Sequence, residues 1–440
     1  MLLQKLKNHY LMERQATLFL LAALFRASSS AEHTFHEAAR SFVDAITESG
    51  KISDTILEQY RQICLIRIPN VLEVDAVAAS EWTLINLQEQ KAFLELMTVV
   101  YYDTISCTSV ECLKVMKVLI LLELGSKQEN RSFFSQEGID LHLKVCHLNA
   151  ILAVEILDFE TLNSLNTEML ISDKNNNLFA DVEMLEEMNE LIWNNIVSTG
   201  SEPRANGVLC MAWACYCQYL VIILNCKNCP SQYEQFLRGQ TPGDRKSAPA
   251  LFQYGYLNLQ GFGFLVQTFQ IIGDTTDLIA YKSILKGLWN LFLSTQEVNS
   301  LPNMEVLVSF FTELFKGSPE LCSQFWCDDF YNEECQSLLI WARNGFPANL
   351  PTFCSMVSSL ISDEKTAIYA FNYLMQVPSF TGFFKIKLKT MLEALTMKCR
   401  SKMLRLCRGW ALASSKILVI SRLAHPTEAS GSFSAIILYD

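Results

Sequence analysis

Glycine and proline are scarce in this chain of 440 residues, at 17 and 11. Strand-like alternation never lasts for more than a few residues, so the scarcity favours long helices with short connections. Charged residues make up only 18% of the chain, and the net charge of −11 lacks the basic excess of a nucleic-acid-binding face. Because half of the residues are apolar, the composition is that of a folded chain rather than a disordered one.

Catalytic motifs are missing as well. The six histidines form no HExxH-like pair, and His142 and His147, five residues apart, do not share a helix face. No GxSxG elbow, Walker loop or kinase set occurs, and Gly261 and Gly263 are only two of the three glycines of a dinucleotide loop. The acidic pair Asp328–Asp329 stands at a predicted helix start, where it favours the helix dipole. We therefore predict no enzyme, no cofactor and no metal site.

Cysteine, by contrast, is frequent, with an odd count of 15. Most cysteines lie in apolar runs, as Cys210, Cys215 and Cys217 do, which favours reduced core thiols in a cytosolic or nuclear protein over a disulfide scaffold. Cys226 and Cys229 form a lone CxxC. Zinc needs four ligands and a redox CxxC needs a βαβ context, so we predict neither function for this pair.

Apolar segments raise the question of a membrane. Ala16–Phe25 has the outline of a signal peptide, but Glu13 lies just before it, so we expect an ordinary first helix. Val208–Leu224 is at the lower limit of a membrane span, and a helix in the middle of a solenoid is equally apolar all round. We favour the core helix, with a span at 208–224 as the lesser alternative and peripheral membrane association at most.

Amphipathic segments follow one another from about Ile52 to Leu395, separated by short polar breaks. Their apolar spacing predicts helices over 54–68, 84–105, 109–124, 141–157, 182–197, 208–224, 257–272, 276–294, 304–315, 319–330, 333–341, 351–360, 364–375 and 381–398. No fixed period or TPR, ankyrin or leucine-rich consensus is present. The prediction is an all-α solenoid of irregular HEAT-like helix pairs, a fold that provides binding surfaces rather than a catalytic site.

Composition divides the chain into five regions. We expect N-terminal helices over 1–50, a first solenoid part over 51–238, a loop at 239–250, a second solenoid part over 251–397 and a basic tail over 398–440. The tail has the pattern of a basic helix, which we interpret as a solvated helix face.

Two stretches resemble a known family. The first stretch, Gln88–Leu162, contains three matching segments: QEQKAFLELMTVVYYD, LKVMKVLILLELGSKQENRSFF and LHLKVCHLNAILAVEILDFETL. The last of them includes ILAVEILDF at Ile151–Phe159. The second stretch joins GVLCMAWACY, with Trp213, to FPANLPTFCSMVSSLISDEKTAIYAFNYLMQVPSF. Its matching positions are Phe346, Pro347, Pro351, Lys365, Tyr369, Phe371 and Leu374. In collinear order these segments are similar to the N-terminal solenoid of the large inner-ring scaffold nucleoporins, of the nucleoporin-188 class.

The resemblance covers about Gln88–Phe384 and implies a right-handed superhelical solenoid at the nuclear pore. It implies a scaffold that docks linker nucleoporins and supports transport of protein and RNA. Family members are very long, so we expect this chain to be an N-terminal part, lacking the family's SH3-like insertion and C-terminal solenoid. The tail 398–440 does not match the family.

FG repeats or transport receptors are further partners that such a solenoid could bind. Pockets for them could be lined by the aromatic residues Trp289, Phe292, Phe310, Phe311 and Phe315, although interhelix core is the simpler interpretation. No direct nucleic-acid partner is expected. A karyopherin-like or vesicle-coat adaptor solenoid shares the same physics and stays the main alternative.

Overall fold

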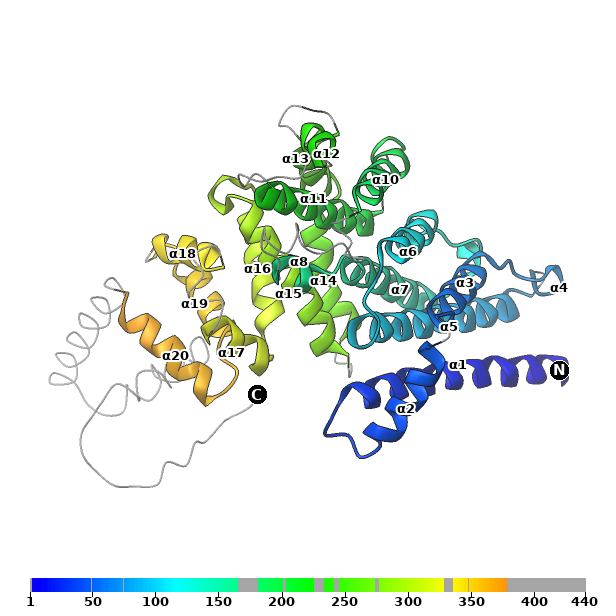
Figure 1. Cartoon of the computed structure of the whole chain (residues 1–440). Coiled ribbons are helices and arrows are strands. Elements are labelled where there is room, and N and C mark those ends of the chain that lie inside the picture. Colours follow the sequence, from blue (N-terminus) through cyan, green and yellow to red (C-terminus); the bar gives the residue numbers. More distant parts are fainter. Residues whose placement is uncertain are drawn as a thin grey trace, which may run out of the picture. The chain divides into compact units, whose positions relative to one another are not determined.

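The computed structural model describes residues 2–377 apart from 49, 74, 165–180, 201–202, 225–232, 241–243, 245, 274–276, 328–334 and 347. Within these residues the regular secondary structure is helical throughout and contains no strand (Figure 1). The all-α solenoid prediction is confirmed. The chain forms two compact units: Met1–Leu314 with Glu333–Ser337, and Phe315–Asn332 with Leu338–Asp440.

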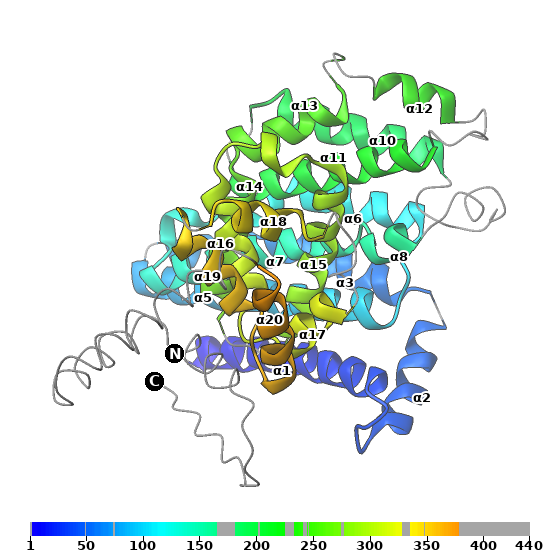
Figure 2. The ribbon, with the colours of Figure 1, turned by 90° about the vertical axis from the view of Figure 1, so that its left-hand side faces the viewer.

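The first unit opens with helices arranged around one long central helix. In chain order these are α1 (Leu2–Ser29), α2 (His36–Thr47), α3 (Ile52–Leu65), α4 (Asn70–Glu73) and α5 (Ala76–Asp103). Helix α5 packs against α1, α3 and α7, as Figures 1 and 2 show from two directions. Because it is covered from several sides, α5 is buried around most of its circumference, including polar residues such as Glu89 and Gln90.

The next helices form a second layer. They are α6 (Ser109–Leu121), α7 (Gln136–Glu155), α8 (Phe159–Ser164) and α10 (Val182–Ile192), which continues into a π-helical turn, η4 (Trp193–Val197). Thr108 and Glu111 form a capping box at the start of α6. Short 3₁₀ turns lie between α6 and α7 at Glu123–Gly125 and Arg131–Phe133.

Helix α11 (Arg204–Leu224) is the centre of the rest of this unit. It is followed by α12 (Glu234–Gly239), α13 (Ala248–Gln253), the π-helical turn η6 (Tyr254–Asn258), α14 (Gly261–Ile272), α15 (Leu278–Thr295), the 3₁₀ turn η7 (Val298–Ser300) and α16 (Met304–Phe315). Helix α11 packs against α7, α13, η6, α14 and α15. Helices from both sides of the predicted loop 239–250 therefore share one core.

Three glycines allow the backbone of α11 to approach that of η6 and α14. A Cβ on Gly207 would lie 3.0 Å from the Gly255 carbonyl oxygen, and one on Gly255 would lie 2.7 Å from the Gly207 carbonyl oxygen. A Cβ on Gly261 would lie 2.8 Å from the carbonyl carbon of Gly207. Such distances exclude any side chain at these positions without a shift of the backbone.

The second unit contains α17 (Pro319–Cys327), most of α18 (Ser337–Asn344), α19 (Leu350–Ser359) and α20 (Glu364–Met375). Its core is aromatic: Trp326 lies 5.7 Å from Tyr373, and Phe353 lies 6.3 Å from Tyr373, between ring centroids. The indole Nε1 of Trp326 donates to the Leu360 carbonyl oxygen at 3.1 Å. Asp363 caps α20 by accepting from the Thr366 backbone N–H at 2.7 Å.

Several predicted helix ends are wrong. We predicted a helix that begins at residue 54, but α3 begins at Ile52 after Lys51, and Asp54 pairs with Lys114. The long helix predicted from residue 84 begins at Ala76, because the Asp75 side chain accepts from the N–H groups of Val77 and Ala78. The Asp75 cap therefore sets the start of α5, whereas α3 begins without a side-chain cap.

Two further starts also differ from the prediction. Helix α7 begins at residue 136 rather than 141, with the Ser135 hydroxyl accepting from Gly138 N. The helix predicted from 257 begins at Gly261, because the π-helical turn at Tyr254–Asn258 precedes it. The predicted helix 381–398 and tail 398–440 lie outside the described residues. The five-region division of the chain, from 1–50 to 398–440, stays a prediction.

In the described part of the chain one helix, α11, is long and apolar enough to cross a membrane, although 78% of its most apolar window is buried among other helices. The core helix of a soluble protein meets the same criterion, so length and composition alone are weak support for a span.

Candidate functional site

A pocket of about 220 Å³ opens in the first unit, where the ends of α5, α7 and α8 meet the middle of α15. It is lined by Tyr101, Tyr102, Ile105, Ser106, Cys107, Val154, Glu155, Ile156, Asp158, Phe159, Glu160, Thr161, Ser283, Ile284 and Gly287. Gly287 on α15 lines the pocket beside α8, where a Cβ would lie at ordinary contact distance, 3.4 Å, from Cβ of Phe159. The pocket is therefore a hollow between helices, built by three separate segments of the chain, 101–107, 154–161 and 283–287.

Local chain geometry brings the acidic side chains of the pocket together. Helix α7 ends at Glu155, and the chain turns through Asp158, whose φ of 46° is left-handed. The Asp158 carboxylate accepts from the Thr161 backbone N–H at 3.1 Å and so caps α8, which carries Glu160 in its first turn. A helix end, a tight turn and a helix start thus place three carboxylates within six residues of the chain.

These carboxylates create a negative field. Burial, with smaller effects from Asp158, Glu160 and Asp103, raises the pKa of Glu155 to about 8. Burial also raises the pKa of Tyr102. A hydrogen bond with Ser283 lowers that pKa in part, whereas the charges of Glu155 and Asp103 raise it further. Every charged group that acts on Glu155 is an acid.

Cations of the described chain leave this field unneutralised. Arg26 acts on Asp103, but its guanidinium is already held by Asp277, with both N–O distances 2.6 Å. Among the described residues, Glu155, Asp158 and Glu160 form no ion pair. That part of the chain also holds no group of three His, Cys, Asp or Glu side chains suited to a metal ion. The site suits an extended organic cation better than a chelated metal.

Glu155 gives the pocket a pH signature. Because its folded pKa of about 8 exceeds the usual 4.5, the native state retains a proton that the unfolded state loses between these values. Its contribution to the free energy of unfolding therefore falls as pH rises from about 4.5 to about 8. We expect the free energy of unfolding of E155Q to rise relative to that of the wild type across this range, by at most about 1.4 kcal/mol per pH unit.

Urea unfolding at a series of pH values measures this difference. The comparison with E155Q removes the contribution of His147, whose pKa burial lowers to about 4 and which destabilises the fold in acid in both proteins. Parallel pH curves for wild type and E155Q would contradict the prediction.

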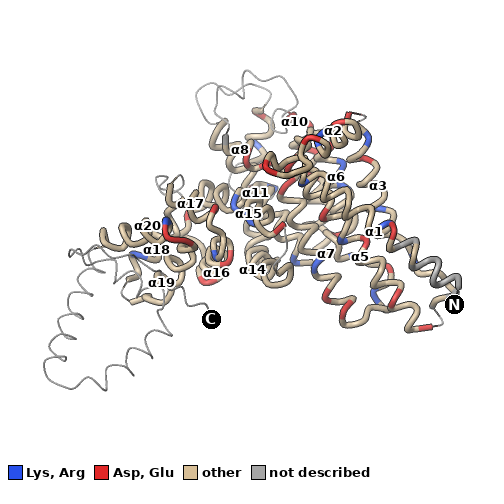
Figure 3. The backbone as a smooth tube through the Cα atoms, turned by 90° about the horizontal axis from the view of Figure 1, so that it is seen from below, with Lys and Arg blue, Asp and Glu red and all other residues tan. Residues whose placement is uncertain are grey.

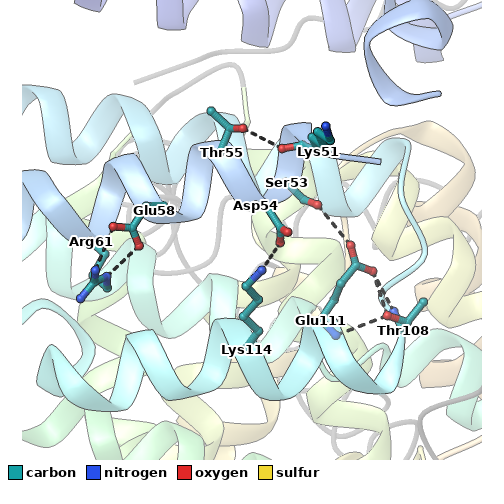
Figure 4. A network of polar contacts seen from close by, with 9 residues as sticks. All are labelled: Lys51, Ser53, Asp54, Thr55, Glu58, Arg61, Thr108, Glu111 and Lys114. Atoms are coloured by element: carbon teal, nitrogen blue, oxygen red, sulfur yellow. Dashed lines mark hydrogen bonds and ion pairs between the residues drawn. The ribbon is translucent and has the colours of Figure 1, made fainter. Parts of the chain in front are cut away.

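A polar network joins α3 to α6 on the surface of the first unit (Figure 4). Lys114 contacts Asp54 at 2.5 Å, and Ser53 Oγ donates to Glu111 Oε1 at 3.1 Å. Hydrogen bonds from Arg61, and next from Gln62, lower the pKa of Glu58 to about 2. Each charge of this network has a partner within the chain, so we interpret it as structural rather than as a binding site.

Residues 283–397 match the family model described as nuclear pore complex scaffold, nucleoporins 186/192/205. The match begins within α15, one wall of the pocket, and extends through α16 to α20. It supports the predicted scaffold-nucleoporin family. A search of curated proteins gave no match.

The aromatic residues suggested for FG-repeat pockets lie in the core. Trp289, Phe292, Phe310 and Phe311 pack in the first unit, where Trp289 lies 5.2 Å from Phe292 and 5.5 Å from Phe310 between ring centroids. Phe315 lies in the second unit, 5.3 Å from Phe325. None of the five is more than 1% exposed, so they cannot line a surface pocket.

The cysteines of the described chain are free, and most are buried. Burial raises the pKa of Cys64 and of Cys215 to about 12, which makes these thiols poor nucleophiles. The CxxC at Cys226 and Cys229 lies outside the described residues.

Lysines and arginines gather into no continuous basic stripe on the described helices (Figure 3). Exposed apolar residues, by contrast, concentrate on the first hairpin: Met12, Phe19 and Leu20 on α1, Phe42 on α2, and Phe35 just before α2. Met12, Phe19 and Leu20 lie near one side of α1, together with exposed Ala16 and Ala23. Neither sequence motif nor periodicity distinguished this face from a buried one.

Helix α1 is held to the first unit by two ion pairs. Arg14 Nη2 lies 2.7 Å from Oε1 of Glu89, whose side chain on α5 is fully buried. Arg26 makes the second pair, with Asp277 before α15. Burial raises the pKa of Glu89, and Arg14 opposes that rise.

Replacing Arg14 with alanine is expected to destabilise the first unit by about 2 kcal/mol, because it leaves the Glu89 carboxylate buried without its cation. The double variant R14M/E89L should be nearly neutral, since it removes both charges and fills their space. Urea denaturation of the three proteins measures the effect. Equal losses in both variants would show that α1 is held by packing alone.

Proposed function

We propose that the protein is a structural scaffold component of the inner ring of the nuclear pore complex, of the nucleoporin-188 class. The family match over residues 283–397 carries the proposal. The helical solenoid and the collinear motifs of Gln88–Leu162 support it, because both are typical of a protein that presents surface rather than an active site. The expected location is the nuclear envelope at the pore, and no catalytic activity is expected.

The proposed mechanism is docking of other nucleoporins, above all the linkers of the inner ring. Stacked helices leave grooves between them, and a short amphipathic helix of a partner binds such a groove through its apolar face. Several weak contacts along one scaffold then act together through their effective concentration. In this way the scaffold supports transport of protein and RNA. FG repeats or transport receptors would need surfaces other than the buried aromatic core.

Localisation of the tagged protein in living cells tests the proposal. A punctate nuclear rim that coincides with a pore marker is the expected result. A diffuse cytosolic or a vesicular pattern would refute the proposed function and favour a karyopherin-like or vesicle-coat adaptor. Selective capture of linker nucleoporins from a lysate separates the same two alternatives biochemically.

A membrane protein spanning at 208–224 is the second candidate, and the length and composition of α11 favour it. Carbonate extraction decides between the two. A peripheral scaffold leaves the membrane fraction at high pH, whereas a spanning protein remains in it.

A further inference from the structure

We propose that the pocket between α5, α7, α8 and α15 is a docking site for an arginine side chain on a helix of a protein partner. This inference deepens the proposed scaffold function by naming one of its binding sites and the chemistry that the site recognises. It combines a cavity, unpaired carboxylates, an aromatic wall and an apolar extension of the groove.

Charge complementarity defines the occupant. Five acids act in or next to the pocket: Asp103, Glu155, Asp158, Glu160 and, beyond the pocket, Asp277. Arg26 is the cation that acts on Asp103, and it is already bonded to Asp277. On α15 the side chains of Lys282 and Lys286 are buried, with Lys282 Nζ 5.5 Å from the ring centroid of Phe269. Within the described chain the pocket therefore keeps a negative charge, which grows as Glu155 ionises near pH 8 and which an incoming cation would neutralise.

Guanidinium fits this pocket better than a metal ion. In the described chain the acids do not converge as a set of metal ligands, whereas the planar fork of arginine offers five donors to acceptors that lie apart. Tyr102 lines the pocket and is 37% exposed, so its ring can receive the flat face of a guanidinium. A hollow of about 220 Å³ also has room for a long side chain as well as its head group.

A helical partner follows from the surface beside the pocket. Ile279 lies one turn before Ser283 on α15 and is 54% exposed, so it extends the pocket wall as an apolar surface. Gly287, one turn after Ser283, also lines the pocket and adds no side chain to this face of α15. A partner helix that places arginine in the pocket would set an apolar residue about one turn away against Ile279.

Selection from a phage library of amphipathic helical peptides, with the full chain as bait, tests the proposal. The comparison bait is E155Q/E160Q, which removes two carboxylates and leaves the Asp158 cap of α8 in place. The control bait is E183Q/E186Q, which makes the same charge change on α10. Circular dichroism checks that all three baits are folded.

Peptides enriched on the wild type should carry an arginine with a large apolar residue one turn away. We expect them to bind E155Q/E160Q at least tenfold more weakly than the wild type, and E183Q/E186Q as well as the wild type. Exchange of the arginine for citrulline should abolish binding, and affinity should rise between pH 6 and pH 9 as Glu155 ionises. Peptides without arginine, or peptides that bind all three baits equally, would overturn the proposal.

The outcome for the arginine pocket can be distinguished from the outcome for the proposed nuclear pore function. Glu155-dependent arginine peptides together with a diffuse cytosolic protein would uphold the pocket and refute the nuclear pore role. A nuclear rim together with peptides whose binding does not depend on Glu155 would support the nuclear pore role and refute the arginine pocket.

Discussion

Replacing Trp213 with alanine is expected to lower the free energy of unfolding of the first unit by about 3–5 kcal/mol. Trp213 lies in α11 and is completely buried, with its ring stacked on Tyr216 at 5.1 Å between centroids. Its Nε1 donates to Oδ1 of Asn189 on α10 at 3.4 Å. The variant therefore opens a large cavity at the centre of the unit and leaves the half-buried amide oxygen of Asn189 without its donor.

Hydrogen exchange of α7 and α14 peptides across a urea series measures this loss for the first unit alone. Ile222→Ala is the matched control, because Ile222 lies in the same helix and is 52% exposed. We expect it to change stability by less than about 0.5 kcal/mol. The contrast also tests the position of α11. If α11 spanned a membrane instead of lying in this core, W213A would not destabilise the protein in water more than I222A does. Equal effects of the two variants would contradict a core role for α11.

Two glycines eight residues apart should respond to alanine with opposite signs. Gly255→Ala is expected to destabilise the first unit by about 3 kcal/mol, since the new Cβ would lie 2.7 Å from the Gly207 carbonyl oxygen and 2.9 Å from Cβ of Cys210. Backbone oxygen cannot move aside as a flexible side chain can, so α11 and η6 must separate.

Gly263→Ala, the control, meets only Cβ of Gln260, at 3.9 Å. Gly263 lies inside α14, where alanine is the better helix former by about 1 kcal/mol, so this variant should be neutral or more stable. Thermal unfolding of the two variants beside the wild type measures the contrast. A loss of stability in G263A, or none in G255A, would show that the helices are not held at glycine-limited distance.

Helix content was predictable because it is recorded locally in the sequence. The segments 304–315 and 364–375 were predicted with the ends that the structure has, since apolar spacing and polar breaks agree there. Of the starts with a capping side chain, that of α20 after Asp363 was predicted correctly, whereas those after Asp75 and Ser135 were misplaced. A cap is a single short polar residue, and only its hydrogen bond distinguishes it from other loop residues.

The pocket was only half visible in the sequence. The motifs YYD at Tyr101–Asp103 and EILDF at Glu155–Phe159 were singled out, but as carriers of a family resemblance rather than as parts of one site. Their meeting with Ser283 and Gly287 depends on how α5, α7 and α15 pack. An acid at a helix end is usually solvated, so no local pattern marked Glu155 as a half-buried group with a raised pKa.

What the sequence determined by itself is therefore the all-helical character of the chain, its lack of catalytic motifs and the family that residues 283–397 match. Those features follow from residue type and spacing along the chain. Only the tertiary structure decided that α11 is a core helix, that Gly207, Gly255 and Gly261 touch, and that unpaired acids face one pocket. Burial and charge pairing depend on distances between segments remote in sequence, and packing alone sets those distances.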